Sequence, residues 1–297
     1  MTDRSRSLVE VHVATLLYGF IGPLGKAVDL DPYQIVFWRT ALAAIVLFLV
    51  AIRLKSHAPI RSWSDLATFA AIAVLLSVHW VLFFQSIKVS TVAIGLVTTY
   101  TYPVLMVFLE SLFFNVRLRV VDFASAVAVL IGVYCLAPEF DLSDANFQGV
   151  LYGMASGAML PLFILLRKKR IIDRYNTWDI SAYELGIAGL LLLPFMFYNE
   201  TLFELPGTRD LVLVVVLGVV LTGFARILFV NSQRLLSGKV VGITLALETV
   251  YGVIIAVIFL AAIPSGREIT GGLIILSAAV FESLRAPAND NVEKGSQ

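Results

Sequence analysis

Six ionisable side chains stand inside the long apolar runs of this 297-residue sequence, and they are its first candidates for chemistry. If such a run crosses a bilayer, an unpaired charge near its centre costs about 2.5 kcal/mol or more. These side chains are therefore expected to face a partner or a water-filled cavity, where cations bind anionic groups and carboxylates bind cationic ones. The six residues are Arg39, His79, Glu110, Glu184, Arg226 and Glu248.

Glu248 is the leading candidate for a polar contact with a solute, because it falls near the middle of its apolar run. The alternative is an internal ion pair with Arg226 or Arg39. A bracing role between helices is favoured for Arg39 and Glu184, which lie 145 residues apart. For His79, a proton relay competes with an ordinary satisfied hydrogen bond, and the hydrogen bond is favoured.

Aromatic and hydroxyl side chains are concentrated in the third and fourth apolar runs. The stretch from Thr98 to Tyr102 is too polar to face lipid on every side, so part of it is expected to line a wet cavity. An apolar wall with a few polar groups suits a zwitterionic amino acid, whose ammonium needs an acceptor and whose carboxylate needs donors. The expected substrate-binding residues are His79, Trp80, Phe83, Thr99, Tyr100, Glu248, Tyr18, Trp38 and Tyr183.

Several classes of function are disfavoured by the rest of the sequence. The three histidines and the single cysteine show no spacing typical of a nucleophile with its base or of a metal site, so an enzyme is not expected. No GxxxxGK[ST] motif occurs, which argues against direct drive by ATP. No metal, cofactor or nucleic-acid partner is expected. The few charges argue against polyanionic cargo, which would need a cluster of lysines and arginines.

Membrane-spanning helices must position these residues. The sequence is 59% hydrophobic and 14% charged, which is typical of a membrane protein that crosses the bilayer many times. Runs of about 20 apolar residues are long enough to cross roughly 30 Å of hydrocarbon. The sequence predicts an all-α membrane protein whose ten helices lie near 8–28, 33–53, 66–86, 90–114, 120–137, 147–166, 177–198, 210–231, 238–262 and 267–284.

The distribution of basic residues predicts the orientation. With the amino terminus in the cytoplasm, the inner segments hold 16 lysines and arginines, Arg167 among them, and the outer segments hold 4. Because basic residues concentrate on the cytoplasmic side, both termini are expected there. The first run contains Gly22, Pro23 and Lys26, and it is interpreted as a retained helix rather than a signal peptide.

The two halves of the sequence resemble each other. A shift of 146 residues aligns eight identical residues without a gap, and a shift of 138 brings Gly19 and Pro23 onto Gly157 and Pro161. Five spans are an odd number, so the second copy would enter the membrane inverted, as in many alternating-access transporters. We therefore expect two inverted five-helix repeats, 1–138 and 146–285, followed by a cytoplasmic tail, 286–297.

Proline and glycine mark the expected hinges. A proline inside a spanning helix removes a backbone hydrogen bond and opens a kink, and a glycine one turn earlier allows close approach of a neighbour. Each proline alone is better explained as a structural kink, whereas matched pairs in both repeats indicate hinges. The expected gating residues are Gly19, Pro23, Gly157, Pro161 and Pro103.

Short motifs in both halves carry a family resemblance. They are Trp38-Arg39, the run from Gln85-Ser86 to Thr91-Val92-Ala93 that leads to Pro103, and the run from Asn231-Ser232 to Leu245-Ala246-Leu247-Glu248. On these residues the chain resembles the drug/metabolite transporter superfamily, EamA type. Thr249 departs from the family pattern, which often has proline there, so helix nine need not bend as helix four does.

The resemblance implies a membrane exporter of small amphipathic metabolites that works by alternating access in the cytoplasmic (inner) membrane. The chain is similar to the bacterial aromatic amino-acid exporter group, which implies amino acids, aromatic ones included, as substrates. The alternatives are a multidrug or other small-metabolite exporter of the same superfamily and a membrane scaffold that transports nothing. The expected partners are a small-molecule substrate and the lipid bilayer, and the oligomeric state is left open.

Overall fold

The computed structural model describes residues 3–55, 57–114, 117–137, 141–201, 206–236 and 238–285. Every regular element in those ranges is a helix, so the predicted all-α class is confirmed for the described part of the chain. The expected tail, 286–297, lies outside the described residues. The helices are α1 (Asp3–Gly19), α2 (Ile21–Ala27), α3 (Pro32–Arg53), α4 (Trp63–Val89), α5 (Val92–Thr99), α6 (Tyr102–Phe114), α7 (Val120–Leu136), α8 (Ala145–Arg170), α9 (Thr177–Tyr198), α10 (Thr208–Val215), η1 (Val216–Phe224), α11 (Ala225–Leu235), α12 (Gly238–Leu260) and α13 (Gly266–Arg285).

Among the described residues, seven helical stretches are long and apolar enough to cross a membrane. They are Asp3–Ala27, Pro32–Arg53, Trp63–Val89, Val92–Leu109, Ala145–Arg170, Thr177–Tyr198 and Thr208–Ser232. Two shorter apolar helices, Val120–Leu136 and Thr244–Leu260, accompany them. Together with α13, these stretches occupy the places of the predicted runs.

Prolines explain two breaks inside the spanning stretches. Pro23 has no N–H to donate to the carbonyl of Gly19, and α1 ends at that glycine. Pro103 likewise leaves the carbonyl of Thr99 without its helical donor, and α5 ends at that threonine. By contrast α12, which carries Thr249 instead of a proline, continues without a break from Gly238 to Leu260.

A π-helical segment joins α10 to α11. Over Val216–Phe224 the helix is wound more loosely than an α-helix, and the hydroxyl of Thr222 donates to the carbonyl of Leu217 at 2.6 Å. π-Helical turns are rare and occur often at functional sites. The apolar run near 210–231 predicted a plain helix here, because the looser winding leaves no distinct pattern of apolar residues.

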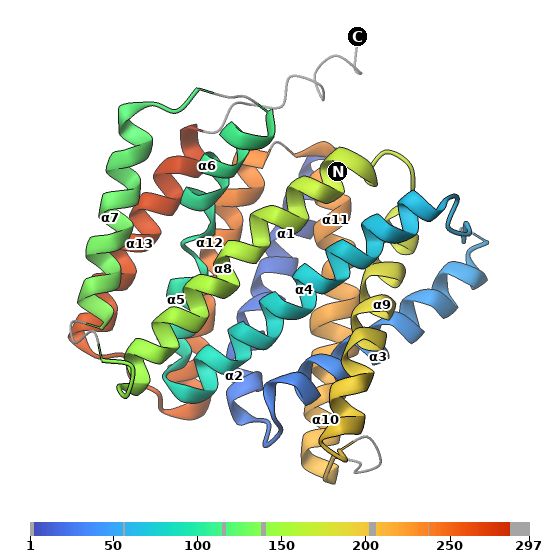
Figure 1. Ribbon diagram of the computed structural model, residues 1–297, viewed down its shortest axis with the longest axis horizontal. Coiled ribbons are helices and arrows are strands. Elements are labelled where there is room, and N and C mark those ends of the chain that lie inside the picture. The colour runs from blue at the N-terminus through green and yellow to red at the C-terminus, as the bar shows by residue number, and fades with distance from the viewer. Residues whose placement is uncertain are drawn as a thin grey trace.

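Helices from the two halves of the chain pack against each other (Figure 1). At one side of the bundle α7 lies beside α13, and at the other side α3 lies beside α9. Between these flanking pairs α4 runs along α8, while α1 packs on α11 and α12. One buried apolar cluster, which includes Ile35, Phe84 and Leu217, joins α2, α3, α4 and η1.

Glycines allow two of the closest helix crossings. A Cβ atom on Gly19 would lie 2.8 Å from the Cβ of Tyr251 on α12. A Cβ atom on Gly157 would lie 2.7 Å from the backbone oxygen of Thr99 at the end of α5. Real Cβ atoms do not approach this closely, so both crossings require glycine, as the sequence analysis expected for these two positions.

The α3–α4 and α8–α9 connections are bonded to each other through Tyr175. Its hydroxyl donates to Asp65 Oδ2 at 2.8 Å and accepts from the backbone N–H of Arg61 at 2.8 Å, while Arg174 forms an ion pair with Asp65. Burial raises the pKa of the Tyr175 phenol above its usual range. This cluster, called here the Tyr175 latch, ties the two halves of the chain together at one end of the bundle.

A candidate substrate cavity

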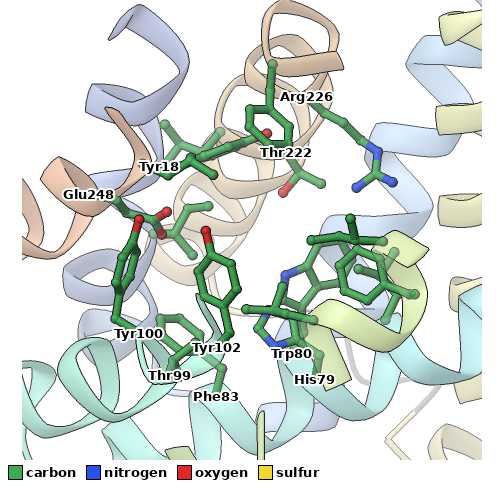
Figure 2. A pocket seen from close by; sticks show the side chains of 18 of the residues that line it. Tyr18, His79, Trp80, Phe83, Thr99, Tyr100, Tyr102, Thr222, Arg226 and Glu248 are labelled. Carbon is green, nitrogen blue, oxygen red and sulfur yellow. The ribbon is translucent and has the colours of Figure 1, made fainter. Parts of the chain in front are cut away.

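A cavity lies in the middle of the bundle, where the two halves of the chain meet (Figure 2). The space open to the centre of a water molecule is about 150 Å³, enough for several waters or one small solute. Its walls come from α1, α2, α3, α4, α5, α6, α8, η1, α11 and α12. The polar and aromatic lining residues are Tyr18, Arg39, His79, Trp80, Phe83, Thr99, Tyr100, Tyr102, Phe163, Arg167, Thr222, Arg226, Phe229, Glu248 and Thr249.

Seven of the nine residues expected to bind substrate line this cavity. Figure 2 shows six of them, Tyr18, His79, Trp80, Phe83, Thr99 and Tyr100, together with the seventh, Glu248. The two others, Trp38 and Tyr183, lie outside the lining. Trp38 packs edge to face on Phe37, and the hydroxyl of Tyr183 donates to the carbonyl of Ala58 at 2.7 Å, close to the Tyr175 latch.

Aromatic rings form much of the apolar wall. Tyr18 meets Phe229 edge to face with ring centroids 5.8 Å apart, which joins α1 to α11 across the two halves. Tyr100 and Tyr102 meet in the same manner at 5.2 Å, and Figure 2 shows their hydroxyls pointing into the cavity. Phenols of this kind offer a flat apolar face together with a hydrogen-bonding group. The wall can therefore hold an amphipathic solute.

Arg39 supplies a cation with no acidic partner among the described residues. The side chain, on α3, is 1% exposed, and its Nε donates to the hydroxyl of Thr222 in the π-helical segment at 2.9 Å. Its guanidinium carbon lies 4.3 Å from the ring centroid of Trp80, and Nη1 has no hydrogen-bond partner in the described part of the chain. Stacking on the indole holds the guanidinium by a cation–π interaction and leaves Nη1 as a buried donor without an acceptor among the described residues.

Two further arginines share one buried carboxylate. Glu184 on α9 is fully buried and accepts from Arg167 Nε at 2.8 Å and from Arg167 Nη2 at 2.7 Å, and it also pairs with Arg226. This cluster, called here the Glu184 triad, ties α9 to α8 and α11, which agrees with the bracing role expected for Glu184. Arg167, counted above among the basic residues of the inner segments, belongs to α8, which continues to Arg170, and its side chain lines the cavity.

Glu248 lies on the opposite side of the cavity from Arg226 (Figure 2). An ion pair with Arg226 or Arg39 was the alternative role for Glu248, and no such pair exists between these described residues. Arg226 pairs instead with Glu184, and Arg39 contacts Thr222 and Trp80. The carboxylate of Glu248 therefore has the charge needed to bind a cationic group of a solute.

His79 is anchored to α8 by its ring. Its Nδ1 lies 2.8 Å from the hydroxyl oxygen of Ser156 and 3.1 Å from the backbone oxygen of Ser156, while that hydroxyl donates to the backbone oxygen of His79 at 2.9 Å. With its one proton donated there, the serine hydroxyl can only accept from Nδ1. This geometry supports the favoured interpretation, in which His79 is a satisfied hydrogen-bonding residue of the wall.

The five residues expected to act in gating lie beside the lining rather than in it. Gly19 and Pro103 are next to the lining residues Tyr18 and Tyr102, and Pro161 follows Leu160. Pro23 and Gly157 lie two and three positions from a lining residue. The side chain of Glu110 lies outside the described residues. Within the described part of the chain, no group of three or more histidine, cysteine, aspartate or glutamate residues could hold a metal ion.

Several lining residues were not predicted from the sequence. Arg167, Phe163 and Thr222 were absent from the expected site, although Phe163 and Arg167 follow Pro161 on the same helix. The matched proline could have directed attention to the turns after it, because bent helices at equivalent places often line a transport pathway. No signal in the sequence distinguished Thr222 from the threonines elsewhere.

Solved and curated proteins are similar to this chain over most of its length. An uncharacterized transporter of Bacillus subtilis, YxxF, is 22% identical over 98% of this chain and 93% of its own length. The pseudopaline exporter CntI of Pseudomonas aeruginosa is 21% identical over 90% of this chain and 92% of its own length. One crystal structure matches with a TM-score of 0.67 and 17% identity over 95% of this chain and 98% of that chain, which shows a shared fold.

Both halves of the chain also match one protein family. The model of the EamA-like transporter family matches residues 8–137 and again residues 147–284. The two matches cover most of the chain, and they include the helices around the cavity. The chain therefore belongs to the EamA-like transporter family and is a multi-pass membrane transporter.

Proposed function

We propose that this chain exports small amphipathic metabolites, amino acids including aromatic ones, across the cytoplasmic membrane by alternating access. The observation that carries the proposal is one cavity that holds Arg39 and Arg226, the separate carboxylate of Glu248 and a wall of aromatic rings. The arginines supply donors for a carboxylate, Glu248 accepts from an ammonium, and the rings receive an apolar side chain. The name of the relative CntI, an exporter, supports outward transport.

The proposed substrate site consists of the expected residues that line the cavity together with the arginines. Tyr100 and Tyr18 contribute hydroxyls and ring faces, and Thr99 contributes a hydroxyl. Trp80 has a double role, because it forms the wall and also holds the guanidinium of Arg39. Trp38 and Tyr183 are proposed to support the site through packing rather than contact with the substrate.

The proposed mechanism rests on two inverted repeats, 1–138 and 146–285, with ten spans in all. Helix boundaries support this division. The helices that start at Pro32 and Thr177 begin 145 residues apart, and those that start at Val120 and Gly266 begin 146 apart. The proposed topology places both termini, including the tail 286–297, in the cytoplasm, as the distribution of basic residues favours.

The packing of the helices also supports the two repeats. α8 packs on α4 and α5, and its counterpart at the start of the first repeat, α1, packs on α11 and α12, which are the counterparts of α4 and α5. Gly19 and Gly157 occupy the matching crossings. We propose that the repeats rock about these glycines and about Pro23, Pro103 and Pro161, which open each side of the cavity in turn.

Transport into proteoliposomes tests the proposal. The cargo panel holds labelled amino acids, with a nucleoside and a cationic dye as comparison compounds. We expect amino-acid flux that Glu248→Gln and Tyr100→Ala reduce at least tenfold, because each removes a group that faces the cavity.

Matched controls change the same residue types outside the cavity. Glu10→Gln alters a carboxylate that pairs with Arg6, and Tyr198→Ala removes a ring that is 88% exposed, so both should transport normally. Flux of the dye alone would assign the chain to multidrug export. Equal flux in Glu248→Gln and Glu10→Gln would remove Glu248 from the site.

A further inference from the structure

We infer that the cargo carries a net negative charge. It would be an amino acid with two carboxylate groups and one ammonium group. This inference rests on the proposed function and names the substrate class within it. It follows from the balance of charges around the cavity, where, among the residues that the structure describes, three guanidinium groups meet only two carboxylates. The five groups are Arg39, Arg167, Arg226, Glu184 and Glu248.

The Glu184 triad already contains one positive charge in excess. Arg167 binds Glu184 through two nitrogens, and Arg226 binds the same carboxylate through Nη2 alone. The Nε of Arg226 is buried and has no hydrogen-bond partner in the described part of the chain. A single carboxylate therefore neutralises one of these two arginines, and the cluster keeps a donor and a charge that no described residue satisfies.

Arg39 adds a second cation without an acidic partner. Trp80 lies against the face of its guanidinium at 4.3 Å and Phe84 lies at 5.4 Å, so a new partner is restricted to the edge of the group. A carboxylate meets a guanidinium along that edge, in the plane of both groups. The guanidinium of Arg39 can therefore bind a carboxylate along its edge, and the two aromatic rings restrict other contacts.

Glu248 balances only one of the two excess charges. Across the cavity from Arg226, it is placed for the ammonium of the cargo. A neutral zwitterion would leave the cavity with one net positive charge, whereas a cargo with two carboxylates and one ammonium brings the total to zero. An uncompensated charge at membrane depth is costly, so the anionic cargo is bound in preference. Protonation of Glu248 would only enlarge the positive excess.

Two pairs of compounds of nearly equal shape test the inference. 4-Carboxyphenylalanine and 4-carbamoylphenylalanine differ by one negative charge, as do glutamate and glutamine. In proteoliposomes we expect kcat/KM at least tenfold higher for the charged member of each pair. Equal values, or a preference for the neutral member, would overturn the inference while leaving amino-acid transport established. Absence of flux for all four compounds and for phenylalanine would instead refute the proposed function.

Substitutions on α3 test whether Arg39 causes the preference for the charged compound of each pair. In Arg39→Gln the charged member should lose its tenfold advantage, and Arg39→Lys should retain most of it, because the positive charge remains. Arg53→Gln, which removes an exposed arginine at the end of the same helix, should behave like the unmodified protein. A preference that persists in folded Arg39→Gln would overturn the role of this residue. If that variant does not fold, the comparison of paired compounds in the unmodified protein still decides the cargo class.

Discussion

Glutamine in place of Glu184 should destabilise the fold strongly, and the structure sets the size of the effect. Glu184 is fully buried and accepts three hydrogen bonds from Arg167 and Arg226, whose side chains are themselves buried. Glutamine has one acceptor oxygen, and its amide N–H groups would point at guanidinium donors. Removal of one partner from a buried ion pair costs about 3 to 5 kcal/mol, because the remaining charge is left without compensation.

The loss should appear as a lower melting temperature of the purified protein. At about 2 °C for each kcal/mol, Glu184→Gln should melt roughly 6 to 10 °C lower. Glu10→Gln is the matched control, because Glu10 pairs with Arg6, whose side chain is 72% exposed. Exposed pairs contribute about 0 to 1 kcal/mol, so this control should melt within about 2 °C of the unmodified protein.

A double substitution separates the triad from general damage to the core. Arg226→Met alone removes one cation and leaves the two bonds between Arg167 and Glu184 in place. Combined with Glu184→Gln, it should destabilise less than the sum of the two single changes, by about 1 to 3 kcal/mol, because the residues are in contact. Strict additivity, or a melting temperature of Glu184→Gln equal to that of Glu10→Gln, would refute the reasoning.

Two further predictions concern the helix crossings and the latch. Gly157→Ala should lower the melting temperature, since a clash costing about 1 to 3 kcal/mol with the Thr99 carbonyl exceeds the helix propensity gain of about 1 kcal/mol. Gly266→Ala, where the added atom meets nothing within 4 Å, should not lower it, and equal shifts in both variants would argue against the crossing. Tyr175→Phe should cost about 1 to 3 kcal/mol by leaving Asp65 short of a donor, without change in the KM for cargo. Because the pKa of Tyr175 is raised, its contribution should be complete below pH 10 and be lost as the pH rises through the folded-state value, which an alkaline melting series of the two proteins measures.

The ends of many helices could be predicted from the sequence, whereas the interruptions inside them could be predicted only in part. The run predicted at 33–53 is the helix Pro32–Arg53, because proline and basic residues bound an apolar stretch there. Pro23 and Pro103 indicated bends correctly. The π-helical segment Val216–Phe224 could not be predicted, because its looser winding leaves no distinct pattern of apolar residues.

The residue type alone does not predict which side chains of a helix face the candidate site. Consecutive helical residues point about 100° apart, so Trp38 and Tyr183 face away from the directions taken by Arg39 and Glu184. Knowledge of the functional face would have separated these neighbours, but the hydrophobic pattern does not reveal it when every face is apolar. Arg167 was hidden for a different reason, because it begins a run of four basic residues that is typical of a cytoplasmic loop.

The partners of the charged residues distinguish architecture from transport. Arg167, Arg226 and Glu184 bind one another, so their charges are explained by contacts between helices. Packing alone would not favour any further buried charge, because a buried charge loses its hydration. Arg39 and Glu248 have no ionic partner among the described residues, yet both line the same cavity. Unpaired charges at membrane depth persist where a solute or water compensates them. The two residues that are hardest to explain by stability are therefore the two assigned to the opposite charges of the cargo, which is the reason to expect that their substitution changes transport more than folding.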